Sequence, residues 1–358
     1  MKNLTDVMSK KYYNGTIILL SNVYGKTKLS INSKLNIISE YFSEEEFEYI
    51  LTALKECKYN VVCYFDENEF IADFLNSKIR FNDYLVFNLA RNGYGVGKKS
   101  LIPTFCDLNN IKYTASNGYA CSIARNKFHV NALLKYLGLN SLESYVFNGN
   151  WLNGKKPNTS NGKKFITKPL FESASQGVSE KSIYDPILSG SIDKFVENNF
   201  YRLNQSLLIV QEFIEGYEAK TTIIDWDKPY ALPPVGVQIN NEQNLGNLII
   251  SDEIAFNYEH KNYLLNNVLG DEFADKIRRD AVKVYNALGM QNYGRIDCRI
   301  DATSKEIYFM DFSTMPYFVS GGEMLFAFQS MGKDIHELLN AIINSALFSK
   351  YNITLDNT

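Results

Sequence analysis

The sequence predicts an N-terminal α/β domain built on a parallel sheet, followed by two lobes of the mixed α+β class. Short apolar runs alternate with helical stretches through the first third of the chain, which is typical of parallel strands joined by helices. Beyond that third, strand-like segments follow one another as antiparallel pairs do. The length of 358 residues also suits two or three lobes better than one core. We place the domains at residues 1–115, 116–211 and 212–358.

In the N-terminal domain, the predicted strands and helices alternate along the chain. The strands are expected at residues 15–20, 60–65, 84–89 and 111–115, and the helices at 41–57 and 101–110. A Rossmann dinucleotide-binding domain would show the same alternation. However, the first predicted strand is followed by the turn Ser-Asn-Val-Tyr-Gly-Lys and not by G-x-G-x-x-G, so the sequence disfavours that class.

The rest of the chain mixes both kinds of element. A helix is predicted from about residue 118 to 140, and a surface loop over 149–163, where Gly, Asn and Lys are frequent. Further strands are expected at residues 164–169, 207–214, 219–225, 294–301 and 307–312, and further helices at 191–204, 271–289 and 323–348.

Composition argues against several classes of protein. Lys and Arg number 37 against 40 Asp and Glu, a net charge of −3, so there is no general basic field for nucleic acid. The five cysteines include no C-x-x-C pair and the three histidines are scattered, which argues against a disulfide framework and a zinc site. The sequence shows no signal peptide and no run of 18 apolar residues. We therefore expect a cytoplasmic protein with no membrane partner.

A strand that ends in a lysine suggests a phosphate site. Residues 164–169 (KFITKP) place Lys168 near the end of a predicted strand, and the small-residue segment 171–179 (FESASQGVS) follows at once. Small residues let backbone N–H groups approach an oxyanion, and together with a lysine they can form a phosphate cradle. The pattern alone fits a hairpin with a solvent-exposed lysine equally well.

Two other segments suggest a nucleotide and a metal. The bend at Gln211–Gly216 could place backbone groups against an adenine edge, with Glu218 accepting from ribose hydroxyls, although an ordinary hairpin explains this segment at least as well. In residues 294–301 (GRIDCRID) and 307–316 (IYFMDFSTMP), Asp297 and Asp311 are expected on one face of two paired strands. Two adjacent carboxylates favour a cation between them, and Mg²⁺ accepts such ligands. A surface charge ladder with Arg295 as the neutralising partner is the alternative.

Taken together, these segments resemble the D-alanine–D-alanine ligase family of the ATP-grasp superfamily, roughly over residues 84–345. The segments similar to the family's motifs are Arg91–Gly97 with the following strand ending IKYT, the helix in Ala124–Gly138, Lys168-Pro169 with the loop 173–177, Gln211–Glu218, Tyr258–Lys261, and GRID with DFSTMP. Each motif alone is weak. Their order and spacing along one chain carry the resemblance.

The resemblance implies an ATP-grasp fold, in which two lobes clasp ATP, and a reaction that activates a carboxylate as an acyl phosphate before an amine attacks. ADP and phosphate would be released, and the implied cofactors are ATP and Mg²⁺, with Mn²⁺ as an alternative ion. The implied phosphate-binding residues are Lys127, Lys168, Ser175 and Lys261, and the implied adenosine-binding residues are Gln211, Glu212, Phe213, Ile214 and Glu218. The implied metal ligands are Asp297, Asp311 and Ser313, and the implied catalytic residues are Arg295, Lys261 and Ser175.

Positions on the substrate side depart from the family pattern. The metal motif reads D-F-S at residues 311–313 where the family has E-x-N, and Tyr317 stands where the family has glycine. The family's serine for the second D-alanine carboxylate is replaced within Ser320–Glu323. Where the family has an N-terminal glutamate for the first D-alanine ammonium, this sequence has the segment Tyr24–Ser30. A lysine in that segment would repel an ammonium and attract a carboxylate or phosphate.

We therefore expect a carboxylate–amine ligase whose acid or acceptor is not D-alanine, as in the biosynthesis of a peptide or amide natural product. The expected partners are a small-molecule acid and an amine, either free or bound to a carrier, and relatives suggest a homodimer. Three alternatives remain. They are a genuine D-alanine–D-alanine ligase, a non-catalytic nucleotide-binding protein, which the altered D-F-S motif favours, and an acyl-adenylate chemistry that releases AMP.

Overall fold

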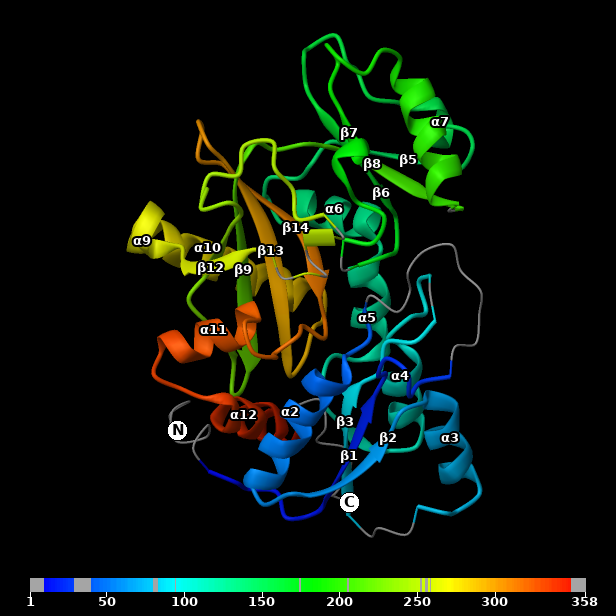
Figure 1. Ribbon diagram of the computed structural model, residues 1–358, viewed down its shortest axis with the longest axis vertical. Coiled ribbons are helices and arrows are strands. Elements are labelled where there is room, and N and C mark those ends of the chain that lie inside the picture. Colours follow the sequence, from blue (N-terminus) through cyan, green and yellow to red (C-terminus); the bar gives the residue numbers. More distant parts are fainter. Residues whose placement is uncertain are drawn as a thin grey trace.

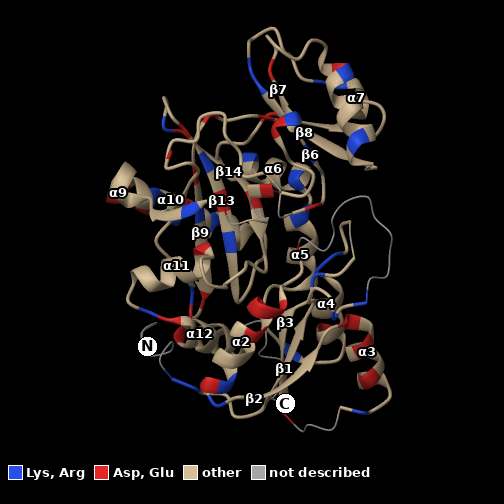
Figure 2. Ribbon diagram, in the orientation of Figure 1, with Lys and Arg blue, Asp and Glu red and all other residues tan. Residues whose placement is uncertain are grey.

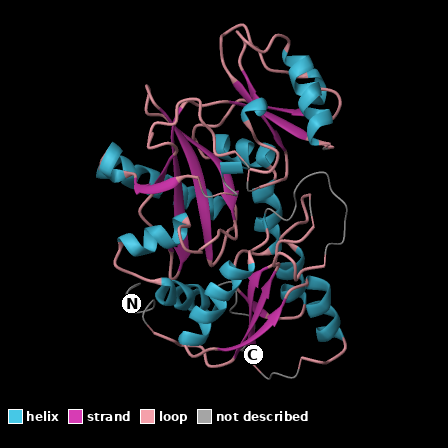
Figure 3. Ribbon diagram, in the orientation of Figure 1, coloured by secondary structure: helices cyan, strands magenta, loops and turns pink. Residues whose placement is uncertain are grey.

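The computed structural model describes residues 10–28, 40–79, 83–93, 95–173, 175–204, 206–251, 253–254, 257 and 259–348. Its strands form three separate sheets with helices packed around them (Figures 1 and 3). The first sheet is parallel and the other two are antiparallel wherever their strands pair. This arrangement confirms the predicted fold class.

The N-terminal sheet has the strand order β2-β1-β3-β4. Its strands are β1 (Thr16–Ser21), β2 (Asn60–Tyr64), β3 (Tyr84–Leu89) and β4 (Lys112–Tyr113), and its helices are α2 (Glu44–Glu56), α3 (Glu67–Leu75) and α4 (Leu101–Leu108). Helix α2 begins where Ser43 and Glu46 form a reciprocal capping box, which satisfies two backbone N–H groups at the helix start. This cap fixes the end of α2 that faces the centre of the molecule.

The central sheet has the order β5-β8-β6-β7. Its elements are β5 (Ser144–Phe147), β6 (Phe165–Pro169), β7 (Ile183–Tyr184), β8 (Leu208–Glu212), α7 (Ile192–Leu203) and the short 3₁₀ helices η2 (Leu152–Gly154) and η3 (Glu180–Ser182). Helices α5 (Gly118–Arg125) and α6 (Lys127–Tyr136) lead into it from the N-terminal domain (Figure 1). The single helix expected over 118–140 is thus interrupted. Asn126 caps α6 by accepting from the His129 N–H, and this side-chain bond competes with a continuous helix.

The third sheet is the largest, with six strands. Its elements are β9 (Gly216–Asp225), β10 (Pro229–Ala231), β11 (Val235–Gln238), β12 (Lys261–Leu264), β13 (Tyr293–Asp301), β14 (Ile307–Ser313), α9 (Asn266–Leu269), α10 (Asp271–Ala287), α11 (Glu323–Ser330) and α12 (Ile335–Phe348). One helix was predicted over 323–348, but α11 ends at Ser330, and Gly332 takes a φ of +72° that ends a helical course.

The C-terminal helices share a core with the N-terminal domain. Residues of α12 such as Leu338 and Ile342 are fully buried in one cluster with Ile50 and Leu54 of α2, and Tyr59 Oη donates to Asn340 Oδ1 over 2.7 Å. This packing fixes α11, and with it Glu323, relative to the first sheet.

We propose that the sheets divide the chain into three domains, with boundaries near residues 115 and 211, because the first sheet ends at Tyr113 and the central sheet ends at Glu212. Within the described residues, no helix combines the length and apolar character needed to cross a bilayer.

Candidate active site

A cavity of about 880 Å³ lies between the central and third sheets and reaches the start of α2. Most of the predicted site residues line it, namely Lys127, Lys168, Ser175, Glu212, Phe213, Ile214, Glu218, Arg295, Asp297, Asp311 and Ser313. The fold therefore brings together residues from β6, α6, the β8–β9 bend, β13 and β14. Figure 2 shows basic and acidic segments side by side along β9, β13 and β14 in the middle of the molecule.

One end of the cavity is formed by the bend between β8 and β9. Phe213 and Ile214 are buried there, and Arg299 of β13 donates to the Ile214 carbonyl over 2.9 Å while its guanidinium lies 5.0 Å from the Phe213 ring centre. Arg299 also pairs with Glu218, with 3.4 Å between Nε and Oε2. An apolar surface beside a carboxylate suits an adenine ring and its ribose hydroxyls. Arg299, the second arginine of GRIDCRID, was not singled out from the sequence.

Gly216 fixes this bend, because its φ is +152° and an added Cβ would lie 2.0 Å from the Ile300 carbonyl oxygen. The Gly216→Ala substitution is expected to lower the free energy of unfolding by about 2–4 kcal/mol, measured by urea denaturation. Gly162→Ala is the matched control. Gly162 also has a positive φ of +76°, but open space surrounds it, so we expect a loss of only about 1 kcal/mol. Equal losses at both positions would contradict the role of Gly216.

The middle of the cavity carries two lysines that share one carboxylate. Lys168 Nζ lies 3.2 Å from Asp311 Oδ2, and Lys127 Nζ lies 3.9 Å from Asp311 Oδ1. Although desolvation opposes it, the two lysines hold the pKa of Asp311 below its usual value. Burial lowers the pKa of Lys127 to about 8. Two lysines around one carboxylate leave positive charge available for a polyphosphate.

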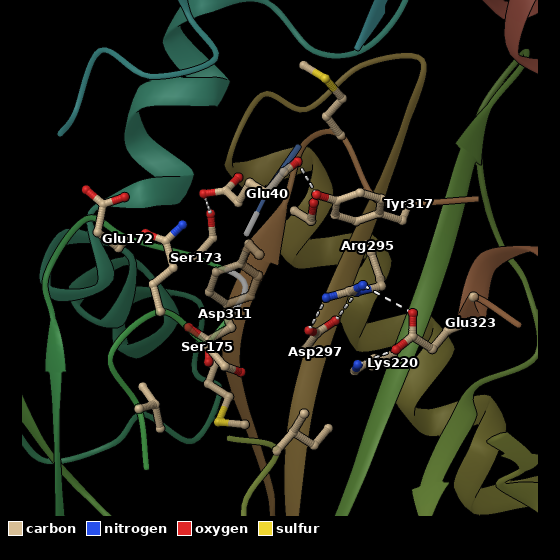
Figure 4. Close-up of a pocket in the computed structure, with 18 of the residues that line it drawn as sticks. Glu40, Glu172, Ser173, Ser175, Lys220, Arg295, Asp297, Asp311, Tyr317 and Glu323 are labelled. Atoms are coloured by element: carbon tan, nitrogen blue, oxygen red, sulfur yellow. Dashed lines mark hydrogen bonds and ion pairs between the residues drawn. The ribbon is translucent and has the colours of Figure 1, made fainter. Parts of the chain in front are cut away.

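The loop after β6 was predicted to supply backbone amides to that phosphate. Two of its amides are used internally, because the Gln176 N–H donates to Ser173 O and the Val178 N–H donates to Ser175 O. Ser175 has a φ of +54°, a conformation that is uncommon for a residue with a Cβ. Its side chain lines the cavity (Figure 4). Lys127 Nζ also donates to the Glu172 carbonyl, which ties this loop to α6.

A chain of four charged side chains forms the opposite wall (Figure 4). Arg295 Nε and Nη2 donate to the two carboxylate oxygens of Asp297, each over 2.7 Å, and its Nη1 lies 3.4 Å from Glu323 Oε2. Lys220 of β9 pairs with Glu323. Burial raises the pKa of Asp297 to about 6, whereas Lys220 and Arg295 overcome the opposing effect of burial and hold the pKa of Glu323 well below its usual value.

The two aspartates do not pair directly across the strands. The β13–β14 register shifts between Ile296 and Asp297, so Asp297 pairs with Met310, and Asp311 takes a φ of +41°, as at a β-bulge. Each aspartate instead has its own basic partner, Arg295 for Asp297 and the two lysines for Asp311. Among the described residues, no group of three or more His, Cys, Asp or Glu side chains is arranged to hold a metal on its own.

Two predicted site residues lie outside the cavity. Gln211 is buried and its side-chain amide donates to Ser144 of β5 over 3.1 Å, so it supports the central sheet. Lys261 is exposed at the start of β12, and Tyr258 of the same predicted motif lies outside the described residues. In the N-terminal segment, Tyr24 lines the cavity, whereas Lys26 pairs with Glu44 over 2.7 Å and is not part of the cavity wall.

A buried group of charged residues at the N-terminal side of the cavity was not predicted from the sequence. Glu40 is 1% exposed and Lys99 is beside it, and both line the cavity together with Arg125 and Glu172. No short motif marks these residues, since Glu40 and its lysine partners are brought together by the fold. Glu323 and Lys220 were missed for the same reason.

The chain is similar in sequence to known ligases. The family described as "D-ala D-ala ligase C-terminus" matches residues 133–344. A D-alanine–D-alanine ligase of Pediococcus pentosaceus is 25% identical over 236 residues, which are 64% of this chain and 59% of that protein. Another, from Carboxydothermus hydrogenoformans, is 24% identical over 300 residues, or 82% of this chain and 90% of that protein.

Solved structures show the same fold. A D-alanine–D-alanine ligase of Bacillus anthracis, complexed with ATP, superposes with a TM-score of 0.67 at 17% identity, covering 93% of this chain and 97% of that one. The VanG D-Ala:D-Ser ligase of Enterococcus faecalis gives a TM-score of 0.64 at 17% identity, covering 93% and 100%.

Proposed function

Because this chain belongs to the D-alanine–D-alanine ligase family, we propose that it is an ATP-dependent ligase that joins a carboxylate to an amine through an acyl phosphate, with release of ADP and phosphate. One observation carries the proposal. Lys127 and Lys168, with their shared Asp311, and the Arg295–Asp297 pair line a single cavity. The lysines suit the phosphates of a nucleotide, and Arg295 suits the negative charge that develops when a carboxylate is phosphorylated.

ATP and Mg²⁺ are the cofactors of this type of ligase, and the donor set of the cavity fits them. Mg²⁺ binds through one or two carboxylates together with phosphate oxygens, and Asp297, Asp311 and the Ser313 hydroxyl offer such donors at the cavity wall. When bound, the ion would offset charge on the transferred phosphoryl group. We assign the adenosine end to Glu212, Phe213, Ile214 and Glu218.

The chain's own residues supply positioning and charge. Both carboxylate oxygens of Asp297 hold the Arg295 guanidinium, and Glu323 holds its third nitrogen. A guanidinium fixed in this way needs no reorientation when negative charge appears beside it, which is the main source of electrostatic catalysis.

Two substrate assignments fit this chemistry. The relatives are named D-alanine–D-alanine ligases, and this favours D-alanine as both acid and acceptor. The cavity supports a different acid, because the buried carboxylate of Glu40 is engaged by Lys98 and Lys99 and is not free to hold the ammonium of an amino acid. We propose the second assignment, in which the acid is not D-alanine. Both the acid and the amine would be small molecules of the cytoplasm.

Nucleotide product analysis tests the proposal. The protein is incubated with Mg-ATP, D-alanine and a panel of other acids and amines, and nucleotides and coupled products are identified by chromatography and mass spectrometry. We expect ADP release that depends on the acid and an amide product other than D-alanyl-D-alanine. Efficient D-alanyl-D-alanine formation would establish the alternative substrate, AMP release would overturn the acyl-phosphate route, and ATP binding without turnover would point to a non-catalytic protein.

A further inference from the structure

A buried group of charges at the N-terminal side of the cavity has no part in the phosphoryl-transfer chemistry described above. Glu40 lies between two lysines, with 2.6 Å from Oε1 to Lys98 Nζ and 2.7 Å from Oε2 to Lys99 Nζ. The Ser173 hydroxyl also donates to Oε1 over 3.1 Å. Both oxygens of Glu40 are therefore occupied by cationic partners.

Two arginines add to this group. Arg125 pairs with Glu172 over 3.2 Å, and both side chains are buried. Arg91 is fully buried, with its guanidinium 4.6 Å from the ring centre of Phe42 and 4.2 Å from that of Tyr317. Within the described part of the chain, Arg91 forms no ion pair with a carboxylate, and its acceptors are the main-chain carbonyls of Leu89 and Met315 and the Tyr317 hydroxyl.

The group thus holds four cations, Arg91, Lys98, Lys99 and Arg125, against the two carboxylates Glu40 and Glu172. The next buried carboxylate, Glu67, already accepts from the Asn22 amide and the Asn92 N–H, and counting it still leaves a positive surplus. Unbalanced charge in a buried site is costly. Burial lowers the pKa of Lys99 to about 7, and the neighbouring Arg91, Arg125 and Lys98 lower it further against the effect of Glu40.

We propose that Lys99 and Arg125, with Arg91 and Lys98 behind the cavity wall, bind a second carboxylate on the acid substrate, so that the acid is a dicarboxylate whose other carboxyl group is activated near Arg295. The inference rests on the proposed ligase function, which supplies the reacting end. Lys99 and Arg125 line the same cavity as Arg295, and Figure 4 draws Glu40 and Ser173 apart from the Arg295–Asp297 pair, as two ends of one substrate require. A surplus of one or two positive charges matches the single negative charge of a carboxylate. An ammonium group would be repelled there, because a lysine already occupies each oxygen of Glu40.

Calorimetric binding to the full chain tests this, in the presence of Mg²⁺ and a non-hydrolysable ATP analogue. The probes are succinate, glutarate and adipate, compared with butyrate and D-alanine. We expect at least one dicarboxylate to bind about tenfold or more tightly than butyrate. Lys99→Met should remove most of that difference, and Lys99→Arg should retain part of it. Lys26→Met is the matched control, because Lys26 is a lysine outside the cavity wall, and it should behave as the unaltered protein does.

The outcomes separate this inference from the proposed function. If butyrate or D-alanine binds as tightly as every dicarboxylate, or if folded Lys99→Met keeps the full preference, the dicarboxylate inference is wrong. ADP release with D-alanine alone would keep the ligase and reject the inference. Tight dicarboxylate binding without turnover of any acid would keep the binding site for the second carboxylate and reject the ligase, and with it the activation of the other carboxyl group. Should Lys99→Met fail to fold, the affinities of the unaltered protein for the dicarboxylates, butyrate and D-alanine still test the inference.

Discussion

Replacing Asp297 with asparagine is expected to lower kcat about 10³-fold, the loss seen when a preorganised group that stabilises transition-state charge is removed. Asp297 holds two nitrogens of Arg295 at 2.7 Å, and an asparagine would present an N–H₂ group to one of them. The same substitution removes a carboxylate from the proposed Mg²⁺ site. Affinity for ATP in the absence of metal should change little, because Lys127 and Lys168 are untouched. Steady-state kinetics and calorimetry measure the two effects.

The control for this substitution lies on the same strand. Asp301 ends β13 in the second R-I-D of the sequence, and its carboxylate accepts from the Thr303 and Ser304 N–H groups outside the cavity. Asp301→Asn should therefore leave kcat close to that of the unaltered protein. If Asp297→Asn retained a tenth of the kcat or more, or if both substitutions had equal effects, Asp297 would not hold the catalytic arginine.

Local pattern was sufficient for much of the fold and for the nucleotide side of the site. Strands such as β1 and β3 are continuous apolar runs, and α10 follows a helical period, so their positions could be read from spacing alone. Lys168, Arg295 and Asp297 lie on strands that mix apolar and polar residues, and the direction of their side chains into the cavity follows from the alternation of side chains along a strand.

The rest depends on tertiary structure. The bulge that gives Asp297 and Asp311 separate partners, and the cap at Asn126 that divides α5 from α6, arise from one residue each and leave the surrounding periodicity unchanged. Glu40 could not be assigned because its partners Lys98 and Lys99 are far from it in sequence. The segment Tyr24–Ser30 was chosen by position along the chain, and Tyr24 does line the cavity, but Lys26 pairs with Glu44 and the buried carboxylate there is Glu40.

Removing the ammonium of Lys168 is expected to weaken ATP binding by about 10–100-fold, since a hydrogen bond to a charged group contributes about 1.5–3 kcal/mol. Lys168 is the next-to-last residue of the buried strand β6 and is 8% exposed, so water can replace its ammonium only in part. Lys168 and Lys127 both pair with Asp311. Loss of Lys168 leaves Asp311 with one cation, and Asp311 should then oppose the approach of a phosphate more strongly.

The measurement is calorimetric titration of Lys168→Ala with ATP, with and without Mg²⁺. The lysine contribution should be largest without the metal, because Mg²⁺ bound at Asp311 would itself offset the carboxylate. Lys164→Ala is the matched control, since Lys164 lies just before the same strand but is directed to Glu215 and Asp185 at the surface. The double substitution Lys127→Ala/Lys168→Ala should cost more than the two single losses combined, because each single variant leaves Asp311 one cation and the double variant leaves it none. If the ATP affinity of Lys168→Ala lay within twofold of the Lys164→Ala value, Lys168 would not be a phosphate-binding residue. The proposed nucleotide site would then lack its principal cation.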